Sequence, residues 1–131
     1  MVTVPDECVK IIGTSALLCP GEVLSINDLL YGILLPSGND AAFTLANFLG
    51  EQVIKHNVQK DNSSRYIHPC SEFHGVRGVK NFIKYMNYFA RELNMLSTFY
   101  DSPHGLSNNH NYSTALDQCI LTYKAMEIEK F

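Results

Sequence analysis

The chain has 131 residues, which is enough for one domain and too few for two full ones. Hydrophobic residues make up 46% of it and charged residues 18%, a balance that excludes a disordered tail and favours an ordered globular fold. Ten basic residues stand against thirteen acidic ones, and no basic run is interleaved with the aromatic residues. Nucleic acid is therefore not expected as a partner.

Neither a membrane segment nor an export signal is expected within the printed sequence. No stretch reaches the roughly 18 apolar residues of a membrane helix. Residues 1–6 carry no basic side chain, and no apolar core of signal-peptide length follows them.

The N-terminal segment predicts a small two-stranded β ribbon. Residues 2–4 are β-branched and end at Pro5, and the mostly apolar residues 22–26 follow the turn-forming pair Pro20 and Gly21. Two such segments favour an antiparallel pair near the N-terminus.

Two helices are predicted on either side of a polar corner. Ser25 precedes Asp28 by three residues, which is the spacing of a capping box, and Pro36 ends the helix that begins there. Residues 37–40 then supply turn and cap side chains. The apolar positions are Ile26, Leu29, Leu30, Ile33 and Leu34 in the first helix and Ala42, Leu45, Ala46 and Leu49 in the second.

Two further helices are predicted in the second half of the chain. Residues 61–65 favour an exposed loop, and the longest amphipathic helix comes after it. Thr114, three residues before Asp117, caps a last helix. The apolar stripes are Val79, Phe82, Ile83, Met86, Ala90 and Leu93 in the former and Leu116, Cys119, Ile120 and Tyr123 in the latter. The predicted fold class is therefore mainly α.

Neither a metal nor a cofactor is expected. The four cysteines are Cys8, Cys19, Cys70 and Cys119. They show no C-x-x-C spacing, so we interpret them mainly as small buried hydrophobic residues. His68, Cys70 and His74 could place three ligands in one loop, but a structural zinc site takes four and this spacing matches no standard pair.

The polar corner at Ser37, Gly38 and Asn39 is the first candidate site. A hydroxyl and a carboxamide stand two residues apart at a helix start, and the glycine between them lets a ligand approach the backbone closely. Helix caps ordinarily use the same residue types, so capping alone is the alternative interpretation.

Residues 29–42, LLYGILLPSGNDAA, resemble the second signature region of the D-alanyl-D-alanine carboxypeptidases, the low-molecular-mass penicillin-binding serine peptidases. Residues 86–95 and the run SPHGL at 102–106 are similar to that family's stretch before and through its His-Gly-Leu loop. Residues 112–117 are similar to the start of its next helix. Order and spacing agree over almost the whole chain.

The resemblance implies a single partial domain over residues 1–131, the helical lobe of a β-lactamase-like transpeptidase domain with at most a small β ribbon. It implies a serine-type peptidase that acts on peptidoglycan stem peptides by acylation of its serine, followed by hydrolysis. Its ligands would be peptides ending in D-Ala-D-Ala, or β-lactams. Ser37 would relay a proton to the departing D-alanine, and Asn39 would donate a hydrogen bond to the substrate's backbone carbonyl. Gly38, His104 and Gly105 would line the substrate site. By the same resemblance the protein would work outside the cytoplasmic membrane.

Two elements that this chemistry needs are missing from the printed sequence. Such enzymes combine S-x-x-K, an S-D-N-like element and K-T-G. No serine here has a lysine three residues later, and no lysine precedes Thr-Gly or Ser-Gly. Because a serine hydroxyl needs an adjacent base to act as a nucleophile, we expect a truncated or degenerate copy without turnover of its own.

Other interpretations stay open. A catalytically silent peptide-binding or protein-interaction module on the same scaffold is the main alternative. A class A β-lactamase is less favoured, because Gly38 stands where that class has Asp and the sequence around His104 fits carboxypeptidases better. A helical lobe without its sheet would expose apolar surface, so self-association is also expected through the face formed by Leu29, Leu30, Ile33 and Leu34.

Overall fold

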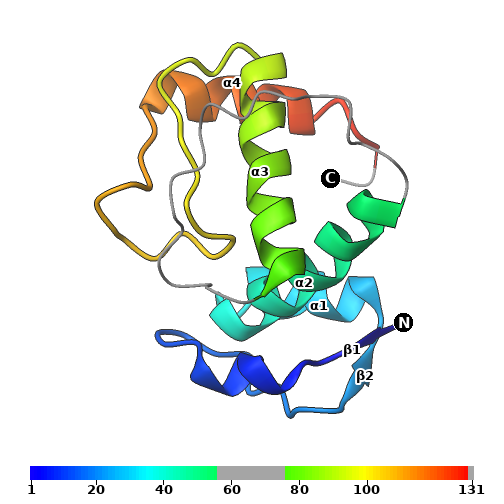
Figure 1. The fold of residues 1–131 in the computed structure, drawn as a ribbon. Coiled ribbons are helices and arrows are strands. Elements are labelled where there is room, and N and C mark those ends of the chain that lie inside the picture. The colour runs from blue at the N-terminus through cyan, green and yellow to red at the C-terminus, as the bar shows by residue number, and fades with distance from the viewer. Residues whose placement is uncertain (56–75, 130–131) are drawn as a thin grey trace.

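Four α-helices and a short β ribbon make up the part of the chain that the structure, a computed structural model, describes: residues 1–55 and 76–129 (Figure 1). The helices are α1 (Ile26–Leu34), α2 (Asn39–Lys55), α3 (Arg77–Glu92) and α4 (Ala115–Ala125). A 3-10 helix, η1 (Asp6–Lys10), which the apolar pattern did not predict, follows the first strand. The prediction of a mainly α fold with a small ribbon is confirmed.

The predicted ribbon forms between β1 (Val2–Thr3) and β2 (Val23–Leu24), which pair antiparallel with Val2 opposite Leu24. Two backbone hydrogen bonds extend the pairing, one from Val4 N to Glu22 O and one from Gly21 N to Val4 O, at 2.8 and 2.9 Å. Val2 and Val4 point into the core and are each 2% exposed. The β-branched residues thus alternate between the core and solvent, as in a half-buried strand.

Helix α1 begins with the predicted capping box. The Oγ of Ser25 accepts a hydrogen bond from Asp28 N, and the Asp28 carboxylate accepts one from Ser25 N, both at 3.0 Å. The Ser25 hydroxyl also donates to the Asp28 carboxylate at 2.7 Å, and this bond together with the one from Ser25 N lowers the pKa of Asp28. The two capping-box bonds satisfy donors that a helix start otherwise leaves unpaired.

The core lies mainly where α3 crosses α2. Phe43 from α2 and Val79 and Ile83 from α3 pack with Val4 and Cys8, and all five side chains are buried. A second cluster on the other side of α2 contains Val2, Leu29, Ala41 and Leu45. Helix α2 is therefore covered on two faces.

Two glycines set the closeness of the α2–α3 crossing. A Cβ atom added to Gly50 would collide with the carbonyl oxygen of Gly78, and one added to Gly78 would collide with the carbonyl oxygen of Asn47. The two backbones are therefore in direct contact, and any side chain at either position would push the helices apart.

The loop between α3 and α4 is fixed by the side chain of Asn87. Its Nδ2 donates to Tyr100 O at 2.6 Å, and its Oδ1 accepts from Tyr100 N at 2.8 Å. The two arms of the loop are joined where Phe99 and Tyr112 exchange two backbone hydrogen bonds and stack their rings at 6.1 Å. A long loop is thereby held in one place without a sheet.

Helix α4 begins at the predicted cap, since Thr114 Oγ1 accepts from Asp117 N at 3.2 Å. Its apolar stripe is not buried: Leu116 is 70% exposed and Tyr123 is 67% exposed. The sequence pattern predicted the helix correctly, but nothing among the described residues covers that stripe.

The interpretation of the cysteines as buried is wrong for two of the three that the structure describes. Cys8 is buried, and this burial raises the pKa of its thiol. Cys19 and Cys119 are exposed free thiols, because they lie in a turn and on the uncovered helix. Cys70, with His68, His74 and the loop predicted at 61–65, lies outside the described residues.

The apolar face of α1 is only partly exposed. Leu29 is buried and Ile33 half-buried against α2, whereas Leu30 is 42% and Leu34 75% exposed. Within residues 1–55 and 76–129, no helix has the length and apolar character needed to cross a bilayer. The same residues contain no cluster of three metal-ligating side chains.

Candidate functional site

The predicted site residues Ser37, Gly38 and Asn39 form the corner between α1 and α2. Ser37 is exposed and has a left-handed backbone with φ of 57°. Gly38 is buried, and its N–H donates to Gly32 O at 3.0 Å. A Cβ atom on Gly38 would lie 2.7 Å from that same oxygen and 2.8 Å from Ala16 N. Only glycine fits here, because any side chain would collide with the backbone of Gly32 and with Ala16.

Asn39 is the first residue of α2 and is 7% exposed. Its backbone N–H donates to Thr14 O and its side-chain Nδ2 donates to Ile12 O, each at 2.8 Å. A carboxamide nitrogen carries two hydrogens, so one donor is left beyond the bond to Ile12. The side chain is therefore held in a fixed orientation and can still make one further hydrogen bond.

Residues 12–18, called the strap below, run directly over this corner. Gly13, with φ of 96°, passes so close to Asn39 that a Cβ atom on it would collide with Asn39 Nδ2. Thr14 Oγ1 donates to the carbonyl oxygen of Ser37. Gly13, Leu17 and Ser37 are all in the positive-φ region. Leu17 and Ser37 carry side chains, so their backbone is strained, and strain of this kind clusters at functional sites, where surrounding contacts hold it in place.

Asp40 holds the strap in place, a role that sequence reasoning missed. Its carboxylate is 4% exposed and accepts from Ser15 Oγ, Ala16 N and Leu18 N, at 2.7, 2.8 and 3.1 Å. Burial raises the pKa of Asp40, but the hydrogen bonds outweigh it, so the pKa lies below the ordinary value of 3.8. In the sequence, an acidic residue in the first turn of a helix is explained by capping, which concealed this contact.

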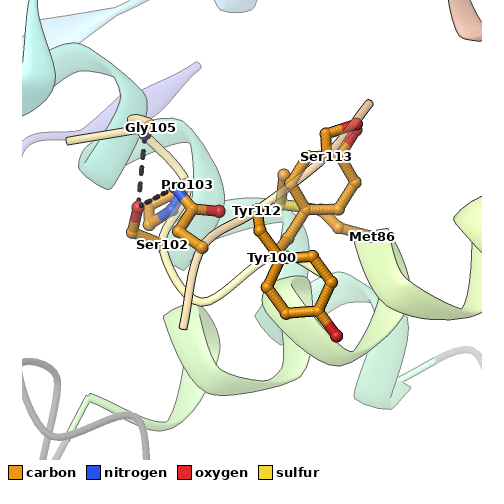
Figure 2. A pocket seen from close by; sticks show the side chains of 8 residues that line it. Met86, Tyr100, Ser102, Pro103, Gly105, Tyr112 and Ser113 are labelled. Carbon is orange, nitrogen blue, oxygen red and sulfur yellow. Dashed lines mark hydrogen bonds between the residues drawn. The ribbon is translucent and has the colours of Figure 1, made fainter. Parts of the chain in front are cut away.

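The second predicted corner, at His104 and Gly105, lies on the loop after α3. His104 is half-buried, and its Nδ1 accepts from Leu106 N at 3.1 Å. Gly105 is exposed with φ of 75°, and its N–H donates to Ser102 Oγ at 3.2 Å (Figure 2). Leu106 reaches the strap, since its Cδ1 lies 3.9 Å from where a Cβ atom of Gly13 would be. The fold thus brings this loop next to the strap.

A pocket of about 270 Å³ opens beside this loop (Figure 2). Its lining residues are Met86, Tyr100, Ser102, Pro103, Gly105, Asn111, Tyr112 and Ser113. Of the five predicted site residues, all of which the structure describes, Gly105 lines the pocket and the other four do not. The pocket therefore includes the predicted site at Gly105 alone.

Comparison with known proteins identifies the fold. A family model described as D-alanyl-D-alanine carboxypeptidase matches residues 74–130. The D-alanyl-D-alanine carboxypeptidase of Streptomyces sp. (strain K15) is 32% identical over 118 residues, which is 90% of this chain. The crystal structure of the Streptomyces K15 DD-transpeptidase superposes with a TM-score of 0.76 and 31% identity over 99% of this chain. In sequence and fold, the chain is similar to part of the catalytic domain of the D-alanyl-D-alanine carboxypeptidase family.

This match confirms the resemblance predicted from the sequence. It covers both the corner at Ser37–Asn39 and the loop at His104 and Gly105. A second relative, DacF of Bacillus subtilis (strain 168), is 27% identical over 117 residues. The chain spans 34% of the Streptomyces relative, 23% of DacF and 44% of the solved transpeptidase chain. The 131 residues therefore correspond to less than half of each of these proteins.

Proposed function

We propose that these residues are the helical lobe of a serine-type D-Ala-D-Ala carboxypeptidase domain and supply the Ser37–Gly38–Asn39 element of its active site. One observation carries the proposal: the corner presents an exposed Ser37 hydroxyl next to an anchored Asn39 carboxamide, in a fold that matches the family's. Capping alone requires neither the positive φ of Ser37 nor a strap over Asn39.

The proposed reaction is acyl transfer from a peptide that ends in D-Ala-D-Ala. A nucleophilic serine from outside these residues attacks the carbonyl carbon of the penultimate residue, forming an acyl-enzyme as the C–N bond to the terminal D-alanine breaks. The proton that the nucleophilic serine releases is relayed through the Ser37 hydroxyl to the departing amine, and water then hydrolyses the ester. The remaining N–H of Asn39 donates to a backbone carbonyl of the substrate.

The walls of the substrate site would come from Gly38, His104 and Gly105. Gly38 keeps the corner narrow, and Gly105 is open to a ligand because no atom lies within 4 Å of where its Cβ would be. A β-lactam would occupy the same place as the peptide end. The family resemblance implies these roles, and the exposure of Gly105 supports them.

Residues 1–131 alone should form no acyl-enzyme, because neither S-x-x-K nor K-T-G occurs among them. Intact mass after incubation with a penicillin tests this point. We expect no mass increase in a sample shown to be folded, and a stable adduct would contradict it.

The positive test is a chimera in which this chain replaces the matching segment of the Streptomyces K15 transpeptidase, which covers 99% of the chain at 31% identity. We expect a folded chimera to be acylated by penicillin and to lose about 100-fold or more in acylation rate on Ser37→Ala, because general acid–base groups contribute about 10²–10⁴-fold. Ser107→Ala is the control, because it removes the hydroxyl of an exposed serine that has no part in the proposed reaction. Equal rates for Ser37→Ala and the parent would overturn the proposal.

A silent interaction module is the second candidate, favoured by exposed apolar side chains in α1 and α4 and at their C-terminal caps. Leu34 is 75%, Leu35 79%, Leu116 70% and Met126 73% exposed. Such patches promote self-association or binding to a partner. Sedimentation velocity over a concentration series tests self-association, and a monomer at every concentration would contradict it.

A further inference from the structure

The strap contacts every residue of the sequence Ser37-Gly38-Asn39-Asp40, although it lies about twenty residues away in the chain. Its backbone carbonyls accept from Asn39, and its N–H groups and the Ser15 hydroxyl donate to Asp40. Its residue Ala16 fills the space beside Gly38. The strap is thus a second wall of the same corner.

Thr14 is the residue of the strap that reaches Ser37. Its hydroxyl donates to the Ser37 carbonyl, while its own carbonyl accepts from Asn39 N at 2.8 Å. One residue therefore bridges the two positions that carry the proposed chemistry. The carbonyl that accepts this bond belongs to a residue whose φ is 57°, a left-handed conformation that residues with a side chain rarely adopt.

We infer that Thr14 is a positioning residue for Ser37: its hydroxyl fixes the left-handed backbone of Ser37 and so aims the Ser37 hydroxyl at the substrate. The inference rests on the proposed function for its catalytic consequence, and on the structure alone for its geometric one. Thr14 is itself exposed, so its contribution to core packing is small.

The geometric consequence is tested on the 131-residue chain by NMR, with Thr14→Val and Thr14→Ser. Valine keeps the shape of threonine and removes the donor, whereas serine keeps the donor. We expect the three-bond HN–Hα coupling and the Cα and Cβ shifts of Ser37 to change in Thr14→Val and to remain those of the parent in Thr14→Ser. Unchanged Ser37 signals in Thr14→Val would overturn the inference whatever the chain does catalytically.

The catalytic consequence is tested in the chimera by penicillin acylation. A misplacement of about 1 Å costs on the order of 100-fold in rate, so we expect a fall of about 10- to 100-fold in Thr14→Val, with rescue by Thr14→Ser and with both variants still folded at the assay temperature. Full activity in Thr14→Val would overturn the positioning role alone. A parent chimera that folds but is not acylated would overturn the proposed function, and the NMR result would still decide the geometric claim.

Discussion

Asp40 and Asp117 perform the same local task in two regions of the molecule. Each lies in the first turn of a helix, is nearly buried, and accepts hydrogen bonds from a hydroxyl and a backbone N–H of an earlier segment. Asp40 pins the strap to α2, and Asp117 pins Ser97 and Thr98 to α4. The two helices differ in packing: α2 is covered on two faces, whereas the apolar stripe of α4 is open. In both regions a buried aspartate fixes the local backbone geometry. We expect the free energy of unfolding to depend more on Asp40 than on Asp117, because α2 is more completely packed than α4.

The largest expected effect comes from breaking the packing of α2. Gly78→Ala places a methyl group against the backbone of Asn47, so it should destabilise the fold by about 3 kcal/mol, at the upper end of overpacking costs. Gly32→Ala is the matched control on α1, because its methyl would meet only the side-chain carbons of Ala41 and Ala16, at 3.1 and 3.3 Å. Urea unfolding measures both. A loss no larger for Gly78→Ala than for Gly32→Ala would contradict the direct backbone contact.

Removing the Asp40 carboxylate comes next. Asp40→Ala leaves the N–H groups of Ala16 and Leu18 without their acceptor, and each buried unsatisfied donor costs about 1–3 kcal/mol. We expect a loss of about 2 kcal/mol in urea unfolding, together with faster amide exchange across the strap. Unchanged exchange at Ala16 would show that something other than Asp40 holds the strap.

Lowering the pH should also show that the stability of the fold depends on the ionised Asp40 carboxylate. Because the folded pKa of Asp40 lies below 3.8, its contribution is fully present above that pH and is lost as the pH falls through the folded value. The urea concentration at the unfolding midpoint should therefore decrease as the pH is lowered below about 4. Asp28 has a lowered pKa too and acts with the same sign, so the profile is compared in Asp40→Asn and Asp28→Asn. An acid profile that is identical in Asp40→Asn and the parent would count against this role.

Asp117→Ala should have a smaller global effect, about 1 kcal/mol, because α4 shares little of the core. Its local effect should be clear, since Ser97 N loses its acceptor and α4 loses its tie to the loop. Amide exchange of α4 is the measurement. A global loss equal to that of Asp40→Ala would remove the distinction between the two regions.

The smallest effect is expected on the open stripe of α4. Leu116→Ser changes a side chain that is 70% exposed, so the free energy of unfolding should shift by no more than about 0.5 kcal/mol. Any self-association should weaken in the same variant, as sedimentation would show. A loss of several kcal/mol would mean that the stripe is covered in solution.

Local signals predicted most of the fold. The apolar spacing predicted the four α-helices found in residues 1–55 and 76–129, and the pairs Ser25 with Asp28 and Thr114 with Asp117 predicted two caps that the structure confirms. Burial was less predictable, because the periodicity that marks Leu29 also marks Leu34 and Leu116, and which of them is covered depends on tertiary packing. The exposed cysteines illustrate the same limit.

The site was predictable only in part. The run Ser37-Gly38-Asn39 stands out in the sequence, whereas the strap does not, because Thr14 and Ser15 are ordinary turn residues until the fold brings them onto the corner. Asp40 was hidden by its second role at a helix start. Contacts between segments more than twenty residues apart leave no periodic signal in one sequence.

The most direct test of the account is a crystal structure of the chimera acylated by penicillin. We predict that the Ser37 hydroxyl and the free N–H of Asn39 lie within about 2.6–3.2 Å of the bound ligand, with the strap still in contact with both residues. A ligand that reaches neither Ser37 nor Asn39 would contradict the assignment of this corner to the active site.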